Sequence, residues 1–173
     1  MSIRKILTEP DPFLRQKSLN VEKVDDENRK LMDDMLETMY AAPGIGLAAI
    51  QVGIPKRIIV IDLSKEGEKK PLYFVNPKII LKSNSNTTYE EGCLSVPGQF
   101  AEIERPNSCH VNYLDYNGTL QELKAEGLLA TCIQHEIDHL EGILFIDYLS
   151  KLKKSFIVKK LSKQKKTLER IVV

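Results

Sequence analysis

The chain is organised around one stretch, Gln134-His135-Glu136-Ile137-Asp138-His139-Leu140. Histidines four residues apart on a helix lie on the same face, one turn from each other, so their ring nitrogens can converge on one divalent metal. Glu136 lies beside them and can take a proton from a water held there. This H-E-x-x-H pattern is typical of hydrolytic metal sites. By itself it is equally compatible with an amphipathic helix whose histidines are buried and hydrogen-bonded.

A metal used for hydrolysis commonly has three protein ligands and a water, so a third ligand is needed. Phe145 stands where the metzincin spacing would place a third histidine. The nearest later carboxylates are Asp147 and Glu169, and Glu169 lies in a strongly basic tail. We therefore expect the third ligand upstream of the motif.

Three cysteines compete for this role. Cys93 lies in a non-helical segment, where neighbouring backbone N–H groups stay free to bind. Cys132 is on the histidine helix but seven residues from His139, a rise of about 10.5 Å, too far to share a metal easily with both histidines. Cys109 alternates with polar residues in a predicted strand, which favours a small core residue.

The composition is that of a single soluble globular domain. The chain has 173 residues, 42% of them apolar and 28% charged. No run approaches the roughly 18 apolar residues of a membrane span. The first residues lack the apolar region of a signal peptide, and an odd number of cysteines argues against a disulfide framework. We therefore expect a cytoplasmic protein, with no membrane partner and a monomeric state.

The charge is distributed unevenly along the chain. Residues 151–173 carry eight Lys, one Arg and one Glu, a net charge of +8, whereas the first 150 residues have a net charge of −7. A basic tail on an acidic body indicates a polyanionic partner for the tail. The alternative is a helix that serves only solubility.

The order of the predicted elements indicates an α+β fold. It has antiparallel or mixed sheets around a central metal-binding helix, an N-terminal helix and a basic C-terminal helix. Residues 1–150 form one catalytic domain, and residues 151–173 form a helical extension of it. We expect a first helix that Asp25 or Asp26 caps and that runs to about Ala41, a second at about residues 127–141, and a last one that starts near Tyr148. We expect strands at residues 57–63, 72–75, 78–81, 100–104, 109–115 and 119–123.

Four details complete this prediction. Asn76-Pro77 separates the second strand from the third, and residues 83–88 form a polar loop. The last three strands form an antiparallel meander, with Asn117-Gly118 as the hairpin turn. The methionines of the first helix belong to the core.

A glycine-rich segment, residues 43–53, follows the first helix. It lacks the Gly-Lys-Ser/Thr ending of a phosphate-binding P-loop. Its backbone can approach a ligand closely, with Gln51 as the side chain that both donates and accepts hydrogen bonds. A tight loop with no ligand is the other interpretation.

Three stretches together resemble the signature motifs of the peptide deformylase family, in the family's order and approximate spacing. The resemblance extends from Pro10 to about Leu149, and the basic C-terminal helix is similar to the bacterial form of many Gram-negative species. The three stretches are Gly44-Ile45-Gly46-Leu47-Ala48-Ala49-Ile50-Gln51, Glu91-Gly92-Cys93-Leu94-Ser95 and Gln134-His135-Glu136-Ile137-Asp138-His139.

The resemblance implies a hydrolase that removes the formyl group from the N-terminal formylmethionine of nascent polypeptides and releases formate. Glu136 matches the general acid/base of the family, which takes a proton from metal-bound water and delivers it to the leaving amine. Gln51 and the backbone N–H of Leu94 match the groups that hold the formyl oxygen. The matching metal ligands are Cys93, His135 and His139.

Further positions match the family's substrate pocket. Gly46 matches a residue that binds substrate backbone, and Glu91 and Arg105 match a structural ion pair near the cysteine. Thr131 departs from the pattern, because relatives commonly have an apolar residue before the cysteine. The residues that match the methionine pocket are Ile45, Leu128 and Cys132.

The resemblance also implies one divalent metal ion, Fe(II) in the native protein, although zinc, nickel or cobalt suits the same ligands. Nascent N-formylmethionyl peptides emerge from the ribosome, so ribosomal RNA is the polyanion that we expect the tail to bind. Two other functions stay open. A general zinc peptidase needs a third ligand downstream, and an RNA-binding zinc module needs a fourth, from Cys109 or His110.

Overall fold

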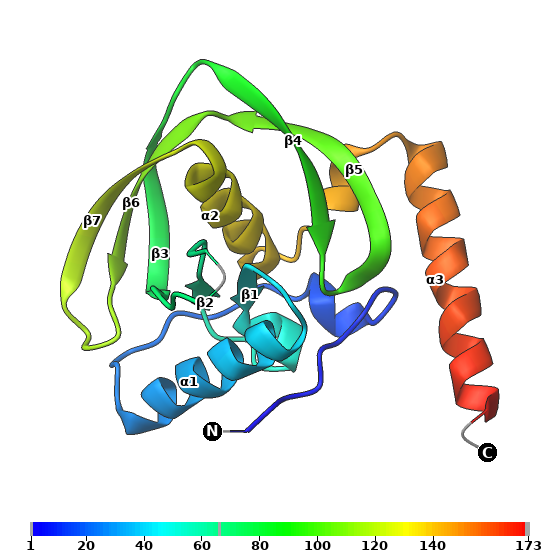
Figure 1. Ribbon diagram of the computed structural model, residues 1–173, viewed down its shortest axis with the longest axis horizontal. Coiled ribbons are helices and arrows are strands. Elements are labelled where there is room, and N and C mark those ends of the chain that lie inside the picture. Colours follow the sequence, from blue (N-terminus) through cyan, green and yellow to red (C-terminus); the bar gives the residue numbers. More distant parts are fainter. Residues whose placement is uncertain (1, 66, 172–173) are drawn as a thin grey trace.

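Two antiparallel sheets surround helix α2 (Gly127–Leu140) in the computed structural model, which describes residues 2–65 and 67–171 (Figure 1). The two-stranded sheet pairs β4 (Asn86–Cys93) with β5 (Val96–Pro106). This arrangement confirms the α+β fold with the histidine helix at its centre. The five-stranded sheet has the order β1 (Gly46–Ala48), β2 (Ile58–Ile61), β3 (Leu72–Lys82), β6 (Ser108–Leu114) and β7 (Leu120–Glu126).

Helix α1 (Asp26–Ala41) begins at the predicted place because Asp25 caps it. The Asp25 carboxylate accepts a hydrogen bond of 2.9 Å from the backbone N–H of Asn28. The apolar stripe of α1 is buried and packs on the outer side of β1 and β2. Its methionines are core residues, as expected: Met32, Met35 and Met39 have no exposed surface.

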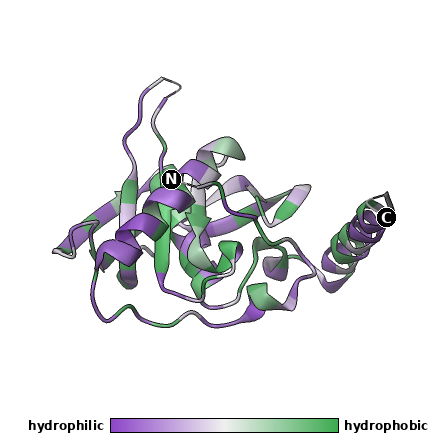
Figure 2. Cartoon of the chain, turned by 90° about the horizontal axis from the view of Figure 1, so that it is seen from below, coloured by the Kyte–Doolittle hydropathy of each residue, from purple (hydrophilic) through white to green (hydrophobic). Residues whose placement is uncertain are grey.

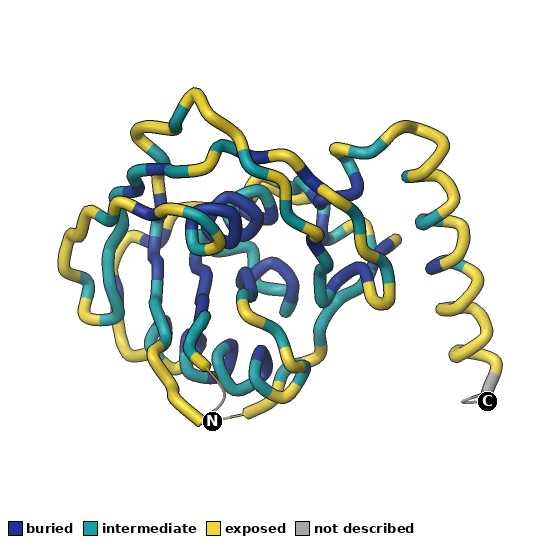
Figure 3. Tube along the Cα trace, turned by 45° about the horizontal axis from the view of Figure 1, so that its top comes forward, coloured by how far each residue is buried: buried dark blue, intermediate teal, exposed yellow. Residues whose placement is uncertain are grey.

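Helix α2 is buried along most of its length, which Figure 3 shows as an almost continuous dark tube. Ala130, Ile133 and Leu140 pack in one cluster with Ile59, Ile61 and Phe74 of the five-stranded sheet. This packing holds one face of α2 rigidly. The polar residues on its other face are therefore fixed relative to β4 and β5.

The expected break at Asn76-Pro77 is wrong, because residues 72–82 form one strand. The backbone of Asn76 has φ 51°, and the pairing with β6 shifts between Val75 and Lys78. Pro77 has no N–H to donate, so a bulge accommodates it without ending the strand. The side-chain amide of Asn76 also makes two hydrogen bonds of 2.8 Å with the backbone of Val21: Oδ1 accepts from the N–H, and Nδ2 donates to the carbonyl.

Other strand boundaries also differ from the prediction. Strand β4 begins at Asn86, inside the predicted polar loop, and β5 pairs with β4 instead of joining a meander with β6. The hairpin of β6 and β7 around Asn117-Gly118 is confirmed. Strand β1, only three residues long, was missed because it lies in the glycine-rich segment.

Helix α3 (Lys151–Ile171) lies along the side of the body (Figures 1 and 2). It begins later than predicted, because Phe145–Tyr148 forms a separate 3₁₀-helix. Leu161, Ile157 and Val158 pack near Val96 and Phe145. Most of the helix surface, including its other large apolar residues Leu152, Phe156 and Leu168, is exposed.

None of the helices within the described residues combines the length and the apolar character needed to cross a membrane.

Candidate metal centre and pocket

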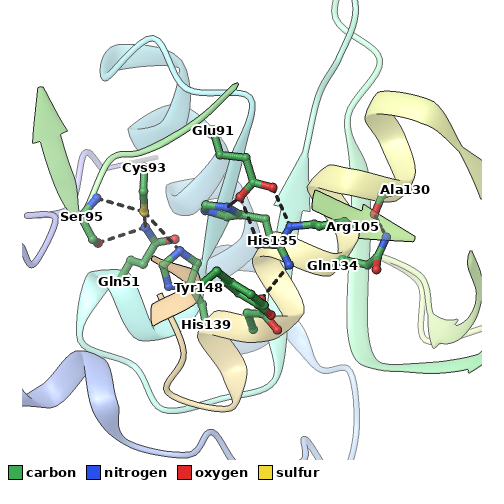
Figure 4. A network of polar contacts seen from close by, with 11 residues as sticks. Gln51, Glu91, Cys93, Ser95, Arg105, Ala130, Gln134, His135, His139 and Tyr148 are labelled. Atoms are coloured by element: carbon green, nitrogen blue, oxygen red, sulfur yellow. Dashed lines mark hydrogen bonds and ion pairs between the residues drawn. The ribbon is translucent and has the colours of Figure 1, made fainter. Parts of the chain in front are cut away.

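One cysteine of β4 and two histidines of α2 lie close together (Figure 4). The ligand atoms of Cys93, His135 and His139 all lie within 4.8 Å of one another. Cys93 ends strand β4, and the histidines lie one turn apart on α2, with ring centroids 5.1 Å apart. A thiolate and two imidazoles are a donor set that suits a divalent transition metal such as zinc or iron. The residues present therefore fit one metal ion.

The other two cysteines lie elsewhere. Cys109 is buried in the core cluster between the sheet and α2. Cys132 lines the neighbouring cavity, and burial raises the pKa of its thiol to about 12, so it stays neutral. The structure thus brings Cys93 alone of the three cysteines to the histidines.

Glu91 holds the ring of His135 in place through Nδ1, the ring nitrogen that would not bind the metal. Nδ1 of His135 lies 2.8 Å from Oε2 of Glu91, which leaves Nε2 free for a metal. Arg105 donates two hydrogen bonds to the same carboxylate, at 2.6 and 3.0 Å. Burial alone would raise the pKa of Glu91, but the bonds from His135 and Arg105 lower it overall, so the carboxylate stays ionised.

Gln51 is positioned by backbone and side-chain contacts. It lies in the 3₁₀-helix Ala49–Val52, and its Oε1 accepts a hydrogen bond of 2.8 Å from the backbone N–H of Ala48. Its Nε2 consequently points to the cysteine loop, 3.0 Å from Oγ of Ser95 and 3.5 Å from the sulfur of Cys93. Leu94, between Cys93 and Ser95, lines the same cavity.

Ser95 is a site residue that the sequence analysis missed. It is fully buried, its hydroxyl accepts from Gln51, and its backbone N–H lies 3.4 Å from the Cys93 sulfur. Its position two residues after the cysteine was the available signal. Its contact with Gln51 spans 44 positions and could not be read from local spacing.

Glu136 lies on α2 next to His135 and is buried. Burial raises the pKa of its carboxyl to about 7, whereas the charge of His135 acts to lower it. Its Oε2 is buried and has no hydrogen-bond partner among the residues that the structure describes. The carboxylate is therefore free to bind a group that enters the cavity.

A cavity of about 480 Å³ opens beside Cys93 and His135. Its wall is mainly apolar, and every residue predicted to bind substrate lies along it: Ile45, Gly46, Leu128 and Cys132. Ile45 and Leu128 are half-exposed at 48% and 44%. The lining also includes residues that the prediction did not include as binding groups, Tyr89, Pro97, Phe100 and Thr131.

Comparisons with known proteins agree on one family. The family model described as "Polypeptide deformylase" matches residues 3–155. The peptide deformylase of Pelagibacter ubique (strain HTCC1062) is 71% identical to this chain over 174 residues, covering 100% of both. That of Phenylobacterium zucineum (strain HLK1) is 62% identical over 167 residues, covering 96% of this chain and 99% of the relative.

Solved structures show the same likeness. The crystal structure of peptide deformylase from Ehrlichia chaffeensis matches with a TM-score of 0.92 and 48% identity, covering 96% of this chain and 98% of the other. A structure of peptide deformylase from the same organism in complex with actinonin matches with a TM-score of 0.91 and 50% identity, covering 95% and 98%.

Proposed function

Because the chain belongs to the polypeptide deformylase family and is a metal-dependent hydrolase acting on N-formyl peptides, we propose specific roles for its site residues. Cys93, His135 and His139 hold the metal, and Glu136 is the general acid/base. The observation that supports these roles most directly is the convergence of the three ligand atoms within 4.8 Å of one another, beside a buried carboxyl group.

A divalent ion held by these ligands would supply Lewis-acid activation of water near neutral pH. The native ion that we propose is Fe(II), on the basis of the family resemblance. The soft thiolate and two imidazoles support a first-row transition metal but suit zinc, nickel and cobalt as well. Metal analysis of protein purified without oxygen distinguishes them.

The chain's own groups handle the proton and the developing charge. A carboxyl group whose pKa is about 7 is suited to accept a proton from water and return it to the leaving amine. The Nε2 of Gln51 and the backbone N–H of Leu94 donate to the formyl oxygen as it gains negative charge. Because Ala48 fixes the amide of Gln51, this donor is already oriented before substrate binds.

The apolar cavity takes the methionine side chain of the substrate. Methionine is unbranched and polarizable, so it fits an irregular wall that includes Ile45, Leu128 and Cys132. We propose that the same cavity binds actinonin, as in the Ehrlichia chaffeensis relative solved with that compound. We also propose that the enzyme works as a monomer in the bacterial cytoplasm.

The test measures formate release from a formylmethionyl peptide by the wild-type protein and by Glu136→Gln. The variant should keep its metal and lose turnover by ~10²-fold or more, because the amide cannot accept the proton. An empty metal site in the variant would show that Glu136 is a ligand instead. Cleavage of an internal peptide bond, measured in parallel, would indicate a peptidase.

A further inference from the structure

The hydrogen bonds that begin at His135 and Glu91 continue through Arg105 toward Tyr148 (Figure 4). Arg105, which binds Glu91, also donates from Nη1 to Oδ2 of Asp138 at 2.8 Å. The hydroxyl of Tyr148 donates to the same Asp138 oxygen at 2.7 Å. An unbroken chain of hydrogen bonds therefore joins a metal ligand to a tyrosine whose exposed fraction is 51%.

Tyr148 makes a second contact with this chain through its ring. The ring centroid lies 4.9 Å from Cζ of Arg105, within the range of a cation–π interaction. Arg105 is only 4% exposed although Tyr148 is half-exposed, so the ring lies between the guanidinium and water. Ion pairs are stronger where water is excluded, so the ring strengthens the bonds between Arg105 and Glu91.

The hydroxyl of Tyr148 is a reliable donor. Burial and the hydrogen bond to Asp138 raise its pKa to about 12, so the phenol stays protonated. Four elements meet in this network, because Glu91 lies on β4, Arg105 on β5, Asp138 on α2 and Tyr148 on the 3₁₀-helix before α3. The network fixes how these elements are spaced around His135.

The two histidines differ in this support. Nδ1 of His135 is bound by Glu91, whereas Nδ1 of His139 is buried with no hydrogen-bond partner among the described residues. Carboxylates that bind the second nitrogen of a ligating histidine fix its ring and strengthen metal binding. Among the described residues, the hydrogen bonds from Tyr148 to Glu91 thus support the ring of His135 through Nδ1, and His139 has no such support.

We propose that Asp138 and Tyr148 are positioning residues for the metal centre: they hold Arg105 and Glu91 in place, and through them the ring of His135. This proposal rests on the assignment of His135 as a metal ligand. It gives a half-exposed tyrosine that does not line the substrate cavity a part in retaining the metal.

The test measures the rate at which zinc-loaded protein loses its zinc to a chromogenic chelator. Tyr148→Phe keeps the ring and loses the hydroxyl, so release should be about threefold faster. Tyr148→Ala also exposes Arg105, and Asp138→Asn removes a charge partner of Arg105. Both should release zinc about tenfold faster, at the low end of the range for outer-shell substitutions. Turnover of each fully loaded variant should stay within about twofold of wild type, since no substrate contact is lost.

Tyr116→Phe is the matched control. The Tyr116 hydroxyl donates to Asp33 at 3.1 Å and takes no part in the hydrogen bonds that join His135 to Tyr148, so this variant loses an equivalent bond outside that network. Its zinc release should equal that of wild type. Glu91→Gln is the positive control and should release zinc faster than every Tyr148 variant.

The proposal is overturned if Tyr148→Phe, Tyr148→Ala and Asp138→Asn all release zinc at the wild-type rate while Glu91→Gln releases it faster. In that case the residues that help to retain the metal extend no further than Glu91. If Tyr148→Ala does not fold, Tyr148→Phe and Asp138→Asn decide the result. A wild-type protein that neither binds zinc nor releases formate would instead contradict the proposed function.

Discussion

A side chain at Gly46 would collide with Glu136, because a Cβ atom at this position would lie 2.5 Å from Oε1 of the carboxylate. The backbone angles at Gly46 are ones that any residue adopts. Glycine is needed here because there is no room for a side chain. It begins β1, at the edge of the five-stranded sheet, where it pairs with Ile61. The edge of the sheet therefore lies directly against the proposed acid/base.

Gly46→Ala should lower the rate of formate release by roughly 10- to 100-fold, because the methyl group displaces the Glu136 carboxylate from its working position. Metal content should be unchanged, since no ligand moves. The loss should be smaller in a Glu136→Asp background, where the shorter acid lies further from the methyl group. Additive losses in the double variant would contradict this explanation.

Cys93→Ser should bind metal more weakly, because a hard alcohol replaces a soft thiolate. Cys109→Ser is the comparison, since Cys109 is fully buried in the core. It should keep metal near the wild-type level, although a buried hydroxyl lowers its free energy of unfolding by about 1–3 kcal/mol. Metal content after purification decides the assignment. If Cys109→Ser loses its metal and Cys93→Ser does not, the third ligand is Cys109 and not Cys93.

Thr131→Val should stabilise the protein, because Oγ1 of Thr131 is buried with no hydrogen-bond partner among the described residues. Removing an unpaired buried hydroxyl from an isosteric side chain should raise the free energy of unfolding by about 1 kcal/mol, or Tm by about 2–4 °C. Turnover of formylmethionyl peptides should persist, since the cavity keeps its shape.

Thr38→Val is the matched control for this prediction. Thr38 is also buried, but its hydroxyl donates to the backbone carbonyl of Asp34 at 2.6 Å and accepts from the backbone N–H of Arg4 at 2.9 Å. The same substitution should therefore lower Tm. A fall in Tm for both variants would show that the Thr131 hydroxyl is satisfied in solution.

Truncation after Ser150 should abolish co-sedimentation with ribosomes while largely sparing activity on short formylated peptides. We propose that α3 binds ribosomal RNA through phosphate contacts that release counterions, so binding should also weaken steeply as salt rises. Residues 1–150 should fold without α3, because few α3 side chains are buried.

A substitution separates charge from packing in this experiment. Lys159, Lys160 and Lys163 are exposed, whereas Leu161 between them is buried against the body. Changing the three lysines to glutamine keeps α3 docked, and it should weaken ribosome binding and reduce its dependence on salt. Unchanged binding by this variant, or co-sedimentation of the truncated protein, would contradict the proposal.

The parts of the site that depend on local spacing were predictable from the sequence. Histidines one turn apart on a helix must share a face, so His135 and His139 could be paired without any structure. The helical rise from Cys132 to His139 argued against Cys132 as a ligand. Local spacing could not choose Cys93 over Cys109, because that choice depends on where the β4–β5 sheet lies relative to α2. The alternating pattern around Cys109 favoured a core position for that residue, and the family resemblance matched Cys93 to the third ligand.

The parts that sequence reasoning missed depend on contacts between distant segments. Ser95, Asp138 and Tyr148 are polar residues with no periodic pattern, and their roles arise from partners on other elements. Strand β4 was partly assigned to a loop because its alternating exposed positions are polar. Strand β3 was divided because a proline usually ends a strand, and here a bulge accommodates it.

The separation of the ligands along the chain has a consequence for the order of folding. Cys93 and His139 are 46 positions apart, and the intervening residues form β5, β6, β7 and most of α2. An extended chain closes so long a loop only at an entropic cost, whereas the formed hairpins already bring its ends together. A complete binding site therefore exists only after the sheets have formed. The metal should therefore bind late in folding. It stabilises a fold that has already formed and does not start its formation.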